Sequence, residues 1–166
     1  MVEWSETARK QGLLGLEPAL ETEPDPFAQK ALQMLVDGTE PDKIREALAT
    51  GHVIDITTTG RKTGEPRRIE IVFHNIDGRL IITGMPRADR QRAWLVNLET
   101  DPSLTFHLKG AVKADLPATA RVITDAMERR TIAEWVSANA WKGQDVEAMT
   151  AHSPMIEVTI LDPVLA

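Results

Sequence analysis

Between Val53 and Thr83 the chain alternates apolar and polar residues, and two turn sequences interrupt the alternation. Residues 53–59 are rich in β-branched side chains, which favours a strand that ends at the turn GRKTGEP. Alternation resumes over residues 69–74, and Asp77-Gly78 is a strong hairpin signal into a third strand at residues 79–83. A meander of three antiparallel strands is therefore the most constrained part of the chain.

Further strands and helices follow this meander. The spacing of apolar residues predicts helices over 91–98 and 144–151 and strands over 103–108, 114–123 and 156–161. Pro117 indicates an edge position or a bulge in its strand, and Thr124 is the expected N-cap of another helix, with Ile132, Trp135 and Val136 on its buried face. Six or so antiparallel strands with inserted helices predict a small β-barrel in an α+β fold.

The first 50 residues have a helical pattern instead. Helices are expected over 6–20, over 26–36 and from Thr39, where Ile44, Ala47 and Leu48 would face inward. We therefore expect two parts, a helical N-terminal extension at residues 1–50 and a barrel at residues 51–166.

Charge and composition narrow the kind of ligand. Residues 51–100 hold 8 basic and 6 acidic side chains, whereas residues 1–50 hold 5 and 10 and residues 101–166 hold 6 and 9. A local basic island in an acidic protein favours an anionic small ligand over nucleic acid. Because the chain has no cysteine, no apolar run of membrane-spanning length and no export signal at its start, we expect no membrane span and a cytoplasmic protein.

The basic island is concentrated in the turn GRKTGEPRR, residues 60–68. Arg61, Lys62, Arg67 and Arg68 lie there beside the hydroxyl of Thr63 and two glycines. Arginine binds phosphate or carboxylate oxygens in a bidentate way and lysine adds a mobile charge, so the turn suits an anionic cofactor. A solvated hairpin turn with ordinary surface charge is the alternative.

The segments ITTTGRKTGEPRR and AWLVNLETDPSLTFHL resemble sequences of the deazaflavin-dependent nitroreductase family, and the resemblance extends from about residue 54 to residue 160. The resemblance implies a split β-barrel, of the FMN-binding-like kind, and transfer of a hydride from reduced coenzyme F420 to a small electron acceptor such as a quinone or nitroaromatic. It also implies a homodimer. FMN and haem are the alternative cofactors.

By matching positions, the resemblance implies a set of cofactor-binding residues. The tail of the deazaflavin would be held by Arg61, Lys62, Thr63 and Arg67. Its ring would contact Gly84 and Met85 of the second loop, GMPRADR at residues 84–90, and Trp94 and Asn97 of the helix that follows. Where the family has a lysine in the second loop, this chain has Arg87, Arg90 and Arg92.

The catalytic residues stay open at this point. His74 and His107 lie on alternating strands, so they are candidates to converge on a proton-donor site or a haem iron, in which case the barrel would be a non-catalytic cofactor carrier. Trp141 is a candidate wall of the active site. We expect no metal site among the functional residues of this chain.

The N-terminal segment has a resemblance of its own. The stretch GLLGLEPALETEPDPFAQKALQMLVDGTEPDKIREAL is similar to a cytoplasmic segment of the flagellar stator protein motility protein A. This similarity implies a helical segment for docking or dimerisation. A protein-interaction module is therefore a third hypothesis for the function, beside the reductase and the non-catalytic cofactor carrier. A helical hairpin that simply covers the barrel is the alternative.

Overall fold

The computed structural model describes residues 10, 13–22, 24–26, 28, 29, 41–162 and 165, which divide into two compact units, residues 1–43 and 44–166. In the first unit, η1 (Leu13–Leu16) and α2 (Glu17–Thr22) lie where the first helix was expected. Most of the helix expected over residues 26–36, and the Thr39 cap, lie outside the described residues.

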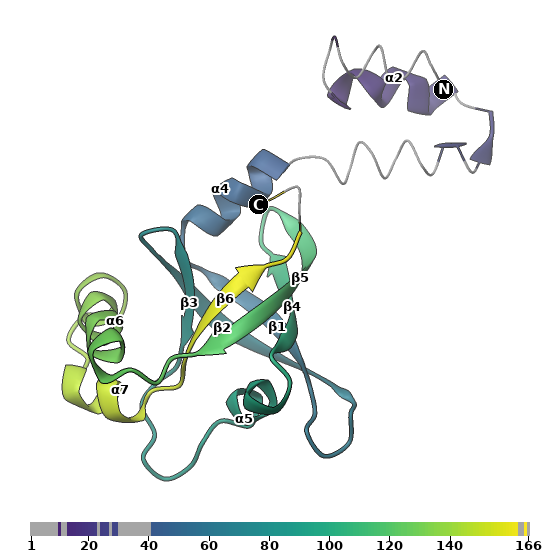
Figure 1. Ribbon diagram of the computed structural model, residues 1–166. Helices are drawn as coiled ribbons and strands as arrows, with labels where there is room; N and C mark the ends of the chain where they lie inside the picture. The colour runs from purple at the N-terminus through teal and green to yellow at the C-terminus, as the bar shows by residue number, and fades with distance from the viewer. Residues whose placement is uncertain are drawn as a thin grey trace. The chain divides into compact units, whose positions relative to one another are not determined.

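The second unit is a closed six-stranded barrel (Figure 1). Its strands are β1 (Val53–Thr59), β2 (Pro66–Ile76), β3 (Arg79–Thr83), β4 (Ser103–Lys109), β5 (Lys113–Val122) and β6 (Met155–Ile160). The order around the barrel is β1-β2-β3-β6-β5-β4, and every neighbouring pair is antiparallel. The α+β barrel predicted from the alternation is confirmed.

Two details of the strand and helix predictions are wrong. Pro117 lies in a strand that is paired on both sides, opposite Thr105, and its carbonyl accepts a hydrogen bond from the Leu161 N–H at 2.8 Å, just past the end of β6. A proline is tolerated there because its missing N–H falls beyond the last residue of the neighbouring strand. The helix cap is Asp125 and not Thr124, since its carboxylate accepts from the Glu128 N–H.

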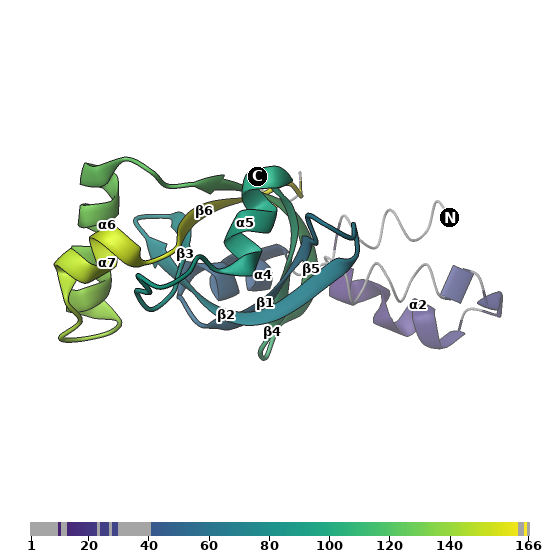
Figure 2. The same ribbon diagram turned by 90° about the horizontal axis from the view of Figure 1, so that it is seen from below.

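The barrel interior is filled by the apolar members of each alternating strand. Ile54, Ile56, Phe73, Ile82, Phe106 and Ile156 are fully buried there. Two helices cover the barrel at opposite ends, as Figures 1 and 2 show: α4 (Pro41–Ala49) packs Ile44, Ala47 and Leu48 against the core, and α5 (Ala93–Thr100) adds Trp94, Leu95 and Leu98. The inward face expected for residues 44–48 is confirmed.

The outer face of β2 and β3 carries a second, smaller core. Helices α6 (Ala126–Asn139) and α7 (Val146–His152) lie beside β3 in both views. Ile132, Val136 and Met149 from these helices pack against Ile76 and Ile81 of the sheet. The two helices therefore bury the apolar outer face of this part of the sheet.

An ion-pair network joins α6 to the sheet and makes stability depend on pH. Glu128 and Glu157 share Arg79 and Arg121, and the Arg121 Nη2 lies 2.7 Å from the Glu128 Oε1. The hydrogen bond from Arg121 is the main cause that lowers the pKa of Glu128 to about 2. Because the pKa of Glu128 is lowered on folding, its ionised form stabilises the fold at pH values above the ordinary pKa of 4.5. This contribution is lost as the pH falls toward about 2.

Replacing Glu128 with glutamine is expected to lower the free energy of unfolding by about 1 kcal/mol at pH 7, because both arginines are partly exposed and screened. The difference from the unmodified protein should shrink between pH 4.5 and pH 3, as urea unfolding at both values and at pH 7 would measure. Glu134→Gln, on the same helix but in an exposed pair with Arg130, is the control. An equal loss at every pH would contradict this origin of the stability.

Candidate functional site

The turn between β1 and β2 is closed by two backbone hydrogen bonds. The Gly60 N–H donates to the Glu65 carbonyl at 2.8 Å, and the Gly64 N–H donates to the Gly60 carbonyl at 2.7 Å. Gly64 has a φ of 71°, and a Cβ on Gly60 would lie 3.0 Å from the Thr63 hydroxyl, so both glycines allow a turn this tight. The loop can therefore present its side chains in a fixed arrangement.

The four cations of this turn have different partners. Arg68 donates to Asp55 at 2.9 Å, and Arg67 pairs with Glu65 at 3.2 Å. Within the described part of the chain, Arg61 and Lys62 make no ion pair. Two of the four positive charges are therefore available to an anionic ligand.

Asn97 of α5 ties the turn to the barrel. Its side-chain carbonyl accepts a hydrogen bond from the Arg61 N–H at 3.2 Å, and its amide donates to the Thr58 hydroxyl at 3.1 Å. Asn97 and Thr58 are both buried, with 5% and 2% of their surface exposed. The helix that follows the second loop thus fixes the position of the cationic turn.

A groove runs from the turn along α5. A pocket of about 600 Å³ is lined by Arg61, Lys62, Thr63, Arg67, Trp94 and Asn97, together with Gly60, Pro66, Arg68, Ile69 and Ala93. A neighbouring pocket of about 330 Å³ shares Ile69, Ala93 and Trp94 with it and continues to Ile71, Gly84 and Pro154. The groove is cationic at one end, and its other end is lined by apolar residues together with Glu70 and Arg92.

Gly84 lets this apolar end come close to the last strand. A Cβ at residue 84 would lie 3.2 Å from the Pro154 ring, so a larger side chain would press into the pocket. A flat ring between Trp94, Ile71 and Pro154, with an anionic tail reaching Arg61 and Lys62, matches the residues that line the groove. The groove therefore fits a cofactor that carries a ring and an anionic tail.

The structure brings together seven of the eight residues expected to bind the cofactor. Arg61, Lys62, Thr63, Arg67, Gly84, Trp94 and Asn97 all line the groove. Met85 is exposed and does not line either pocket, but its carbonyl accepts a hydrogen bond from Arg92.

The three catalytic candidates lie elsewhere. His74 is on the outer face of β2, packed edge-on against Trp135 and Trp141 with ring centroids 6.1 Å and 5.3 Å away. Burial lowers the pKa of His74, so it is neutral at pH 7. Trp141 belongs to the same packing cluster and lines neither part of the groove.

The expected convergence of His74 and His107 is wrong. Their strands flank β1 on opposite sides, and His107 is held between the Thr57 hydroxyl at 2.7 Å and the Asp115 carboxylate at 2.6 Å. The two histidines therefore cannot form a common haem or proton-donor site. In the described ranges, no cluster of three or more histidine and carboxylate side chains suits a metal ion.

Two residues that shape the groove were not anticipated: Thr58, which accepts a hydrogen bond from Asn97, and Pro154, which lines the second pocket. Thr58 follows Ile54 and Ile56 at every second position of β1, so the alternation itself places it on the inward face. Pro154 comes from the far end of the chain, and no local pattern connects it with Gly84.

Comparison with known proteins agrees with this geometry. Residues 30–163 match the family described as F420H(2)-dependent quinone reductase. Solved structures share the fold at low identity: a proposed 5-nitroimidazole antibiotic resistance protein from Bacteroides thetaiotaomicron is 13% identical (TM-score 0.55, 75% of this chain and 81% of that chain). A proposed pyridoxamine 5′-phosphate oxidase from Listeria innocua is 15% identical (TM-score 0.52, 74% and 94%).

Motility protein A of Borreliella burgdorferi is similar only over a short stretch. It is 48% identical over 48 residues, which are 29% of this chain and 18% of that protein. The chain thus spans less than a fifth of the curated relative that it matches. No helix among the described residues has the length and apolar character needed to cross a membrane.

The family match covers most of the chain, including every strand of the barrel and the whole groove. The likeness to the two solved structures agrees with the split-barrel architecture. The chain therefore belongs to the F420H2-dependent quinone reductase family, and it is an oxidoreductase whose cofactor is coenzyme F420.

Proposed function

We propose that the groove along α5 is the F420 site of this reductase, with the tail at the turn and the ring between Trp94 and Pro154. The observation that carries this assignment is the position of Arg61 and Lys62, which pair with no described carboxylate, at one end of a groove whose other end offers the apolar side chains of Ile69, Ile71 and Trp94. Phosphate and glutamate oxygens are the groups that such side chains bind.

The residues of the groove bind and orient the cofactor, and they exclude water from its ring. Arg61 and Lys62 hold the tail, with Thr63 and Arg67 beside them, and Asn97 keeps the turn in place. Ile69, Ile71 and Trp94 form an apolar wall that keeps water away from the ring. Bound F420, in its reduced form, supplies the hydride, and the acceptor is an electron-poor small molecule of the quinone or nitroaromatic class.

A titration of the purified protein with three compounds tests the site. We expect F420 to bind about 100-fold more tightly than the corresponding deazariboflavin, which carries the same ring without phosphate or glutamates, because the tail contacts contribute roughly 3 kcal/mol. FMN, with a phosphate but no glutamates, should bind with intermediate or weaker affinity. Equal affinities for F420 and the tailless ring would overturn the role assigned to the turn.

We also propose that the residues ahead of α4 form a docking or dimerisation segment, and that the protein is a homodimer. The similarity to a segment of motility protein A supports an interaction role for this part of the chain. Because Ile44, Ala47 and Leu48 pack against the barrel, a truncation that tests the segment has to retain α4 and begin at residue 40. Light scattering should show loss of the dimer with F420 affinity unchanged; a dimer that persists would exclude the segment from the interface.

A further inference from the structure

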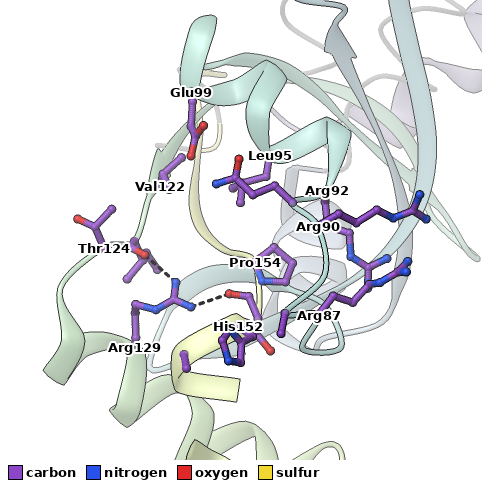
Figure 3. Close-up of a pocket in the computed structure, with 15 residues that line it drawn as sticks. Arg87, Arg90, Arg92, Leu95, Glu99, Val122, Thr124, Arg129, His152 and Pro154 are labelled. Atoms are coloured by element: carbon purple, nitrogen blue, oxygen red, sulfur yellow. Dashed lines mark hydrogen bonds between the residues drawn. The ribbon is translucent and has the colours of Figure 1, made fainter. Parts of the chain in front are cut away.

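A further pocket adjoins the end of the groove at Gly84 and Pro154. Its volume is about 550 Å³ (Figure 3). Its lining comes from the loop after β3, from α5, from the end of β5 and the loop that follows, from α6, and from the end of α7 with the segment before β6. It shares Arg92 and Pro154 with the ring pocket, so the two pockets are neighbours. Anything bound here would lie next to the place proposed for the reacting ring.

This pocket is strongly cationic. Its lining contains four arginines, Arg87, Arg90, Arg92 and Arg129, and a single carboxylate, Glu99. In Figure 3, Arg87, Arg90 and Arg92 lie on one side of Pro154 and Arg129 lies on the other, while Glu99 is at the far end beside Val122. The carboxylate therefore does not stand among the three loop arginines.

Carboxylates of the described residues neutralise few of these positive charges. Arg87 pairs with Asp89 at 2.9 Å. The hydrogen bond from Arg87 is the main cause that lowers the pKa of Asp89, and the charge of Arg90 also lowers it. Arg129 donates to the carbonyls of Ile123, Thr150 and Ser153, at 2.7 to 2.9 Å. Arg90 and Arg92 make no ion pair within the described ranges.

Two polar atoms at the pocket also lack a partner. The Arg92 Nε and the Ser153 Oγ are buried, and neither makes a hydrogen bond to a described residue. Ser153 is only 2% exposed, and it lines the pocket together with Arg92. Buried polar atoms without partners are rare in folded proteins, and both of these belong to residues that line the pocket.

We propose that this pocket binds a carboxylate or comparable oxyanion on the hydride acceptor, so that the substrate is an anionic electron-poor molecule. The proposal rests on the proposed function for the position of the ring. Arg90 and Arg92 hold the oxyanion beside the ring pocket, and Arg129 sets the positive field of the opposite wall. A neutral acceptor would leave the arginines without an anionic partner.

The test uses two nitroaromatics of the same shape, 4-nitrobenzoate and 4-nitrotoluene, with protein free of F420. Binding is followed by calorimetry and by quenching of tryptophan fluorescence. We expect the charged probe to bind about tenfold more tightly than the neutral one, and we expect added salt to reduce this preference. Arg90→Gln/Arg92→Gln should abolish the preference, and the exposed single variant Arg90→Gln should reduce it without a change in folding.

Arg130→Gln is the matched control, since Arg130 neighbours Arg129 in sequence but pairs with Glu134 and Glu147 outside the pocket. Equal binding of the two probes by the unmodified protein, or an undiminished preference in Arg90→Gln/Arg92→Gln, would overturn the proposal. The single variant Arg90→Gln, whose side chain lines this pocket and not the ring pocket, is titrated with F420: an unchanged affinity assigns the pocket to the acceptor, whereas a tenfold loss would overturn that assignment and mean that the cofactor's own tail occupies it. Failure of the F420 site would show instead as loss of the preference for F420 over its tailless ring.

Discussion

Replacing Arg61 and Lys62 together with glutamine is expected to weaken F420 binding about 100-fold. Each charge-assisted contact to a phosphate or carboxylate contributes about 1.5 kcal/mol when the side chain is partly exposed, and two such contacts amount to a change of about 100-fold in Kd. The other two cations of the turn are already paired, with Glu65 and Asp55, and therefore compensate little. The measurement is a fluorescence titration with F420 at low and at physiological salt.

The matched control removes two positive charges from another surface. Arg130→Gln/Lys142→Gln lowers the net charge by the same amount without touching the groove, because both side chains are exposed on or near α6. We expect this variant to bind F420 within about twofold of the unmodified protein, because surface charges separated by more than a Debye length are largely screened. Unchanged affinity in Arg61→Gln/Lys62→Gln, or the same loss in both variants, would exclude a specific role for the turn.

The strands of the barrel could be predicted from the sequence because their alternation is local. Each strand buries every second side chain, so Ile54 and Ile56 of β1 and Phe106 of β4 mark their own inward faces. The turn at Asp77-Gly78 was equally predictable, since both residues adopt positive φ, 52° and 85°, in a two-residue hairpin. The cationic turn was found because all its residues are consecutive.

Features that depend on closure of the barrel could not be predicted in this way. His74 and His107 each lie on a strand beside β1, but pairing rules do not say on which side, and the order β2-β1-β4 places them apart. Pro154 meets Gly84 only because β6 pairs with β3, across about 70 residues of chain. The same closure pairs Pro117 with Thr105 of β4 and places it just beyond the last residue of β6.

Asn97 is the residue whose substitution should affect both stability and binding. Asn97→Leu leaves the Thr58 hydroxyl and the Arg61 N–H without their partner, and a buried polar group without a partner destabilises a fold by about 1–3 kcal/mol. We expect a loss of about 2 kcal/mol in the free energy of unfolding, measured in urea. F420 affinity should fall about tenfold, because the turn that carries Arg61 and Lys62 loses its attachment to α5.

A second substitution separates the two effects. Adding Thr58→Val replaces the other buried partner by an apolar group of the same shape, so Asn97→Leu/Thr58→Val should recover about 1 kcal/mol of stability. F420 affinity should not recover, since the Arg61 N–H still lacks its acceptor and the turn remains unattached. If affinity returns together with stability, Asn97 acts on binding only through the fold; if it stays low, Asn97 is a positioning residue for the cationic turn.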